Sequence, residues 1–131
     1  MAGPTLNTDQ KTALEKWVDT IPLLPAAAGL DPAAVARGSM LFNDPKVGCA
    51  TCHAGTLLTN NMTVDVGTGQ ALQVPSLRGV SWRAPFMHNG CAATLADRFG
   101  DASCSGGDKH GLTSTLTPAQ ISDLTTYLES L

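Results

Sequence analysis

Apolar residues recur at helical spacing near the start of the chain. The pattern i, i+3, i+4, i+7 predicts an amphipathic helix over residues 8–21, which Asn7 or Thr8 can cap and Pro22 ends. We expect the ring of Trp17 to pack in the core of this N-terminal extension. The apolar stripe of the helix consists of Leu14, Trp17, Val18 and Ile21.

The next helix is predicted from its start signals. Asp31 is a favourable N-cap residue, Pro32 is a favourable first helical residue, and Phe42 lies on the apolar face that follows. A glycine in a helix interior costs about 1 kcal/mol relative to alanine. The presence of Gly38 therefore predicts that a second helix crosses this one closely.

The final helix carries the strongest local signals. Thr117 and Gln120 form a capping box, with Pro118 at the first helical position. Tyr127 lies beside the apolar stripe that follows. The stripe consists of Ile121, Leu124, Leu128 and Leu131.

The central part of the chain shows little periodicity. Residues 55–75 are rich in Gly, Thr and Asn and predict a long ordered loop. We expect a short helical turn at 75–78, a short helix at 94–99 that Gly100 ends, and a polar loop at 101–116. Because no credible pair of strands appears, the predicted class is all-α.

The composition sets the scale of the fold and excludes some functions. The 131 residues fit one domain. Only 5% of them are aromatic, while 13 are Gly and 8 are Pro, so the chain has few large apolar side chains with which to build a core. The formal net charge of −3, without basic patches, argues against nucleic-acid binding. No apolar run approaches the length of a transmembrane helix.

Residues 49–53 read Cys-Ala-Thr-Cys-His, the spacing that attaches c-type haem. Cys49 and Cys52 can each form a thioether with one vinyl group of the haem. His53 can then bind the iron as its proximal ligand. The flat apolar cofactor would also fill the middle of a fold that lacks large side chains.

Two other interpretations of the cysteine pair remain open. Cys91 and Cys104 could join Cys49 and Cys52 in a zinc site with four thiolates. A redox dithiol of the thioredoxin type would need a strand before the motif, whereas the sequence predicts a helix there.

The remaining cysteines are consistent with export. Covalent haem attachment occurs outside the cytoplasm, so we expect a periplasmic or otherwise exported protein whose signal peptide is absent from this sequence. In such an oxidising compartment Cys91 and Cys104 can pair as a disulfide. Closing so short a loop stabilises the fold by about 3 kcal/mol on the chain-entropy model.

The sixth coordination position of the iron decides between electron transfer and ligand chemistry. Met87 lies in a loop bounded by Pro85 and Gly90, which can present a side chain rigidly. We expect His88 to stabilise this loop and His110 to be a surface or helix-capping residue. The candidate ligands are Met40, Met62, Met87, His88 and His110.

Several segments together resemble a known group of proteins. The chain resembles the C-terminal, electron-accepting haem domain of bacterial dihaem cytochrome c peroxidases and MauG-like proteins. The segments that carry this resemblance are 65–69, 74–80, 84–90, 93–95 and the ending 110–120. The resemblance implies the class I cytochrome c fold, whose first and last helices cross, and this would bring Gly38 and Phe42 against Tyr127. Those enzymes carry two haem-attachment motifs, and this chain has one.

The resemblance also implies roles for two residues and a division of the chain. In that domain the Met of the Pro-aromatic-Met-His-Asp/Asn-Gly motif is the distal ligand of the high-potential haem, which implies Met87 here. Arg78 is then expected near the haem propionates. The chain divides into an N-terminal helical extension, 1–31, and a cytochrome c domain, 32–131.

The sequence as a whole predicts a monohaem c-type cytochrome that transfers single electrons, with His/Met axial ligation, and that is not itself an enzyme. The expected partner is a redox protein or a fused oxidoreductase domain. The alternative function is a haem enzyme of peroxidase type with a labile sixth ligand.

Overall fold

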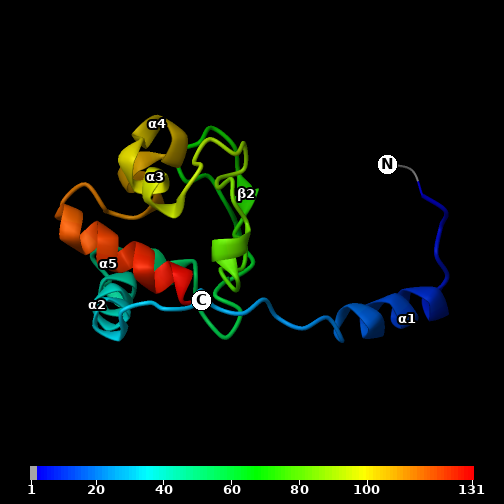
Figure 1. Ribbon diagram of the computed structural model, residues 1–131. Helices are drawn as coiled ribbons and strands as arrows, with labels where there is room; N and C mark the ends of the chain where they lie inside the picture. Colours follow the sequence, from blue (N-terminus) through cyan, green and yellow to red (C-terminus); the bar gives the residue numbers. More distant parts are fainter. Residues whose placement is uncertain (1–2) are drawn as a thin grey trace.

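The computed structural model describes residues 3–131. Helices dominate this part of the chain, which confirms the all-α class (Figure 1). The elements are α1 (Thr8–Val18), α2 (Pro32–Asn43), η1 (Cys49–Thr51), β1 (Thr63–Val64), β2 (Leu72–Gln73), η2 (Val80–Trp82), α3 (Leu95–Gly100), α4 (Ala102–Ser105), η3 (Gly107–His110) and α5 (Pro118–Glu129), where η marks a short 3-10 helix.

Helices α2 and α5 cross closely at the centre of the fold, as the sequence predicts. A Cβ added at Gly38 would lie 2.0 Å from the carbonyl oxygen of Asp123, so only glycine permits this approach. Beside the crossing, the rings of Phe42 and Tyr127 lie 5.2 Å apart. Arg37 donates from Nε to Oδ2 of Asp123 at 2.7 Å, which adds an ion pair between the two helices.

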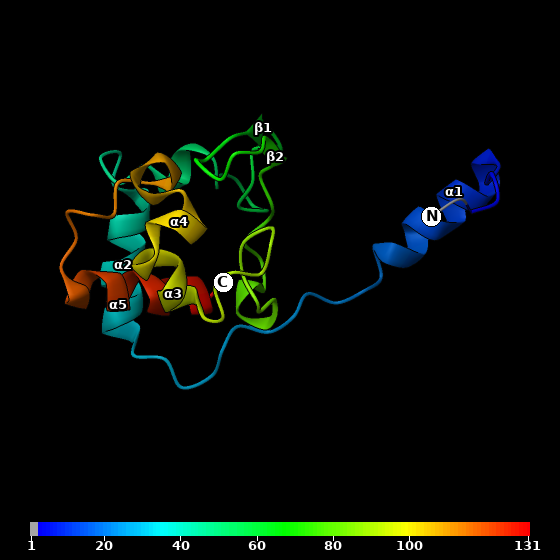
Figure 2. The same ribbon diagram turned by 90° about the horizontal axis from the view of Figure 1, so that it is seen from above.

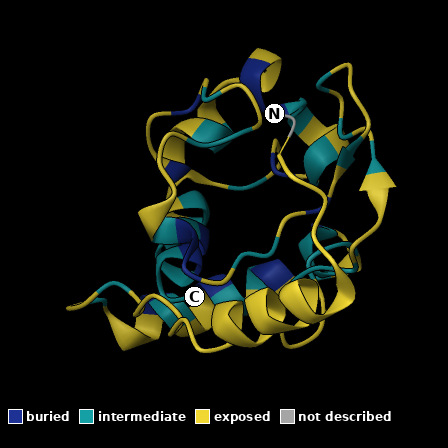
Figure 3. Ribbon diagram, turned by 90° about the vertical axis from the view of Figure 1, so that its right-hand side faces the viewer, coloured by how far each residue is buried: buried dark blue, intermediate teal, exposed yellow. Residues whose placement is uncertain are grey.

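The buried side chains line the inner face of this helix pair and reach the short helices on either side. Leu124 of α5 has 0% of its surface exposed and lies at the centre of the cluster. Figure 3 shows the buried residues as dark blue segments of the ribbon. The buried members of the cluster are Phe42, Val80, Leu95, Leu124 and Leu128.

The segment between η1 and α3 differs from its prediction in two details. β1 and β2 form a short antiparallel pair, with Thr63 opposite Gln73, so the expectation that the chain has no pair of strands is wrong in this detail. The helical turn lies at η2, after Gly79, and not at 75–78, because Gly79 adopts the left-handed conformation that begins the turn. This segment forms the side of the fold that faces α3 and α4 (Figures 1 and 2).

The predicted polar loop at 101–116 contains two short helices. Asp101 accepts hydrogen bonds from the backbone of Ser103 and Cys104, and this N-cap begins α4. Gly106, in the left-handed conformation, ends α4 and begins η3. The capping signal is present in the sequence, but the helices are too short for an apolar period to reveal them.

The N-terminal helix α1 stands away from the rest of the fold (Figures 1 and 2). Trp17 is 62% exposed, so its predicted burial in a core is wrong, because α1 has no partner surface in this structure. The connector is held to the fold where Nε1 of Trp82 donates to the carbonyl of Pro25 at 2.8 Å. In the part of the chain that is described, no helix is both long and apolar enough to cross a membrane.

Candidate haem site

The two cysteines of the 49–53 motif lie on a tight turn that follows α2. Gly48 adopts φ = +84°, a left-handed conformation that lets the chain turn into η1. The backbone nitrogen of His53 donates to the carbonyl of Cys49 at 3.0 Å, which completes the turn. Cys49 and Cys52 are both free, half-buried thiols, so both are available for thioether bonds.

The imidazole of His53 is held by the loop that follows it. Its Nδ1 lies 3.2 Å from the carbonyl oxygen of Leu58. Because a carbonyl only accepts, this contact places the proton on Nδ1 and leaves the lone pair of Nε2 for a metal. Burial lowers the pKa of His53, and backbone contacts with Leu58 and Pro75 partly oppose that shift. The lowered pKa favours the neutral ring, which is the form that binds a metal.

The loop that holds His53 is itself tied to residues 74–78. The hydroxyl of Ser76 donates to the carbonyl of Leu57 at 2.6 Å. Nε of Arg78 donates to the carbonyl of Thr56 at 2.8 Å, and the rest of this side chain is exposed. Arg78 thus supports the loop beside His53, and its expected contact with a haem propionate stays a prediction.

The methionines differ in their access to the site. Met40 is 67% exposed and Met62 is 59% exposed, so neither is held toward a buried iron. Met87 is half-buried, and a bridge between Phe86 and Ala92 closes its loop. His88 is exposed beside it. Among the methionines within residues 3–131, only Met87 therefore has the partial burial that an axial ligand needs.

His110 occupies a position that the sequence did not predict. Its ring centre lies 6.4 Å from that of His53, and its Nδ1 is buried without a hydrogen-bond partner within residues 3–131. Burial chiefly lowers the pKa of His110 to about 4, with Arg98 and His53 adding to the shift and the backbone of Ser105 opposing it. The expectation that His110 is a surface or capping residue is wrong, because η3 turns it toward the motif.

Arg98 is a second residue of the site that the sequence analysis missed. Its guanidinium donates to the carbonyl of His110 and lies 4.7 Å from the centre of the Phe99 ring. Within the described residues, no carboxylate forms a salt bridge with it. Burial lowers the pKa of Arg98 from its ordinary value, and the proximity of Cys49 partly offsets that shift. A half-buried, unpaired cation therefore lies near the cysteine motif.

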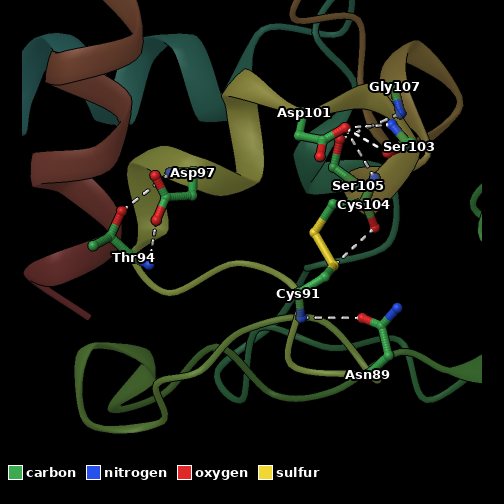
Figure 4. The surroundings of a disulfide bond; sticks show 9 residues. All are labelled: Asn89, Cys91, Thr94, Asp97, Asp101, Ser103, Cys104, Ser105 and Gly107. Atoms are coloured by element: carbon green, nitrogen blue, oxygen red, sulfur yellow. Dashed lines mark hydrogen bonds between the residues drawn. A yellow bond between two sulfur atoms is a disulfide. The ribbon is translucent and has the colours of Figure 1, made fainter.

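Cys91 and Cys104 form a disulfide, with their Cα atoms 5.7 Å apart (Figure 4). The bond joins the end of the Met87 loop to α4, where Cys104 is buried. The side chain of Asn89 accepts a hydrogen bond from the backbone of Cys91 at 3.2 Å. Since these two thiols are consumed, a zinc site with four thiolates is not formed, and no other group of three or more ligating residues is found within residues 3–131.

The comparisons with known proteins agree on one fold. The family model for cytochrome c matches residues 35–131. Hydrazine synthase subunit gamma of Kuenenia stuttgartiensis is 28% identical to this chain over an alignment 142 residues long. The alignment covers 72% of this chain and 40% of that protein. A chain of Kuenenia stuttgartiensis hydrazine synthase, solved under 20 bar xenon, superposes with a TM-score of 0.77 at 24% identity.

The superposition covers 95% of this chain and 56% of the solved chain. This chain therefore spans roughly half, or less, of the length of the proteins that it matches. The likeness confirms the class I cytochrome c fold that the sequence predicts.

Proposed function

Because the chain belongs to the cytochrome c family, which carries covalent haem c with its iron, we propose that Cys49 and Cys52 hold this haem in an electron-transfer domain. His53 binds the iron as the fifth ligand. The observation that carries the proposal is the contact of Nδ1 of His53 with the carbonyl of Leu58, beside two free thiols at the required spacing. When bound, the haem supplies one-electron chemistry at its iron.

The residues around the motif hold and orient the cofactor. The carbonyl of Leu58 fixes the rotation of the His53 ring and raises its basicity as a ligand. Cys49 and Cys52 fix the haem edge beside η1. The helix pair α2 and α5 supplies the apolar surface that excludes water, and low solvent access is one of the factors that set a haem potential.

The sixth position has two candidates. The resemblance to the peroxidase domain supports Met87, and the half-burial of this residue is compatible with His/Met ligation. The placement of His110 supports a second histidine, which the next subsection develops. Either ligand gives a six-coordinate iron suited to electron transfer and unsuited to substrate binding, so the proposed function does not depend on the choice.

We further propose that this chain is a module or subunit of a larger oxidoreductase. The relative it matches is named as a subunit of hydrazine synthase, and this chain corresponds to 40% of that relative's length. The resemblance to a MauG-like electron-accepting domain supports the same role. In this proposal residues 32–131 form an exported cytochrome domain, residues 1–31 form the extension, and a redox protein or fused domain exchanges electrons with the haem.

The attachment can be tested by haem staining of the denatured protein after expression in a host with a c-type maturation system. Changing Cys49→Ser together with Cys52→Ser should abolish the covalent stain. The control variant with Cys91→Ser and Cys104→Ser loses the same number of sulfur atoms, and it should retain the covalent haem stain. A stain that survives loss of Cys49 and Cys52 would overturn the proposal.

A further inference from the structure

The ring of His110 lies opposite that of His53, and no role has been assigned to it. We propose that His110 binds the haem iron as the sixth ligand, so that the haem has bis-histidine ligation. This inference rests on the proposed function, because it needs a haem held by Cys49 and Cys52.

The separation of the two rings matches this ligation. An imidazole–metal bond is about 2 Å and a ring nitrogen lies about 1.2 Å from the ring centre, so two imidazoles on opposite sides of one metal have centres about 6.4 Å apart. The centres of His53 and His110 are 6.4 Å apart. Their planes are tilted by 39°, which two axial rings can adopt by rotating about their metal–nitrogen bonds.

The two rings belong to opposite sides of the fold. His53 is held by Leu58, in the segment between η1 and α3. His110 ends η3, and its carbonyl accepts a hydrogen bond from Arg98 of α3. Figures 1 and 2 show α3 and α4 facing the segment that holds His53. Two axial ligands must approach a haem from opposite faces, and this arrangement provides that approach.

The segment that leads into the Met87 loop is bound to the His53 side. Arg83, four residues before Met87, donates to the carbonyls of Ser76 and Arg78. Arg78 in turn donates to Thr56 in the loop that holds His53. The backbone leading into Met87 is therefore bound to the same side of the fold as the proximal histidine, while the Cys91–Cys104 disulfide ties the end of this loop to α4.

The chemistry of His110 also suits a ligand. The ring is half-buried, and its buried Nδ1 lacks a hydrogen-bond partner in the described structure. A buried ring nitrogen without a partner has lost its hydration with no compensation, so an interaction of this imidazole with a ligand or metal would be favourable. Arg98 donates to the carbonyl of His110 and so holds the backbone that carries this ring.

The test uses the haem-loaded full chain and its spectra. In the wild type we expect low-spin absorption and electron paramagnetic resonance signals of bis-histidine haem, without the near-infrared charge-transfer band of Met–iron ligation. His110→Ala should become high-spin and return to low-spin on addition of imidazole. Met87→Ala, the matched control, should keep the wild-type spectrum.

Two outcomes separate the hypotheses. A Met–iron charge-transfer band in the wild type that disappears in Met87→Ala would overturn bis-histidine ligation and establish His/Met ligation. The wild-type spectrum alone decides this point even if His110→Ala fails to fold. Failure of the proposed function has a different signature, since denatured protein would then lack covalent haem altogether.

Discussion

The positive charge of Arg98 lies among residues that surround the proposed haem, and no carboxylate neutralises it in the described structure. A fixed cation near an iron centre favours the reduced state, because the reduced haem carries one positive charge less. Arg98→Met should therefore lower the reduction potential, by roughly tens of millivolts at an intermediate effective dielectric. Spectroelectrochemical titration measures this shift.

A matched control for Arg98 is Lys11→Met in α1, which removes one positive charge from the exposed N-terminal helix. Its potential should stay at the wild-type value, since solvent screens a distant exposed charge. Arg98→Lys should retain most of the wild-type potential. Equal shifts in the Arg98→Met and Lys11→Met variants would show that Arg98 exerts no local effect.

At the scale of single residues, the sequence revealed the parts of the site that are contiguous. Cys49, Cys52 and His53 form one run, and their spacing alone carries the chemistry. His110 lies 57 positions after His53 in the numbering, and only the path of α3, α4 and η3 brings the two rings to 6.4 Å. No local pattern distinguishes such a histidine from one on the surface.

At the scale of elements, the crossing of α2 and α5 depends on the absence of a side chain at Gly38. Gly38→Ala would place a Cβ 2.0 Å from the carbonyl of Asp123 and 2.6 Å from Cβ of Tyr127, so the helices must separate. We expect a loss of about 1–3 kcal/mol or more in the free energy of unfolding, the usual range for overpacking. Chemical denaturation of the haem-loaded protein measures this loss.

Gly100→Ala provides the control for this substitution. Gly100 also lies in a helix, and nothing is found within 4 Å of a Cβ built there. The change should be neutral or stabilising by up to about 1 kcal/mol, because alanine loses less conformational freedom on folding. If both alanine variants had the same stability, the close crossing would not explain Gly38.

The elements that the sequence predicts well are those with their own local signals. α2 begins at Pro32 and α5 at Pro118, each after its expected cap residue. The sequence did not predict α4, which has four residues, or the strands β1 and β2, which have two residues each. Elements this short contain too few residues for an apolar period to appear. The exposure of Trp17 was missed because a pattern shows which face is apolar and not whether a partner covers it.

The disulfide connects the end of the Met87 loop to α4 across a sequence separation of 13, and on the chain-entropy model its effect on stability comes from closing this loop. Removing it with Cys91→Ser and Cys104→Ser should lower the free energy of unfolding by roughly 2–4 kcal/mol, through the entropy of the unfolded chain. We also expect the axial ligation to become more labile on heating, because α4, which precedes the His110 helix, loses its tether. Thermal melts followed in the haem absorption band measure both effects.

A direct chemical measurement accompanies this prediction. Thiol titration of the denatured, unreduced haem protein should find no free thiol, since Cys49 and Cys52 carry the haem and the other two cysteines are paired. Detection of two free thiols would exclude the bridge in solution. An unchanged melting profile in the double serine variant would show that the bridge does not hold the two sides together.

At the scale of the whole molecule, one haem with both axial positions filled by protein side chains suits electron transfer more than peroxide chemistry. Peroxide must bind the iron to react, and a saturated iron offers no position until a ligand leaves. The haem-loaded wild type should therefore turn over peroxide far below an enzyme-like rate of about 1 per second. A standard peroxidase assay with a small electron donor measures this turnover.

The peroxidase prediction also connects the choice of sixth ligand to function. Removing the true ligand opens a position on the iron, so the variant that becomes high-spin should gain peroxidase activity while the other keeps the low wild-type rate. We expect His110→Ala to show the gain and Met87→Ala to show none. Enzyme-like turnover by the intact wild type would instead favour the alternative function, a haem enzyme with a labile sixth ligand. Such turnover requires that a coordination position of the iron be open to peroxide.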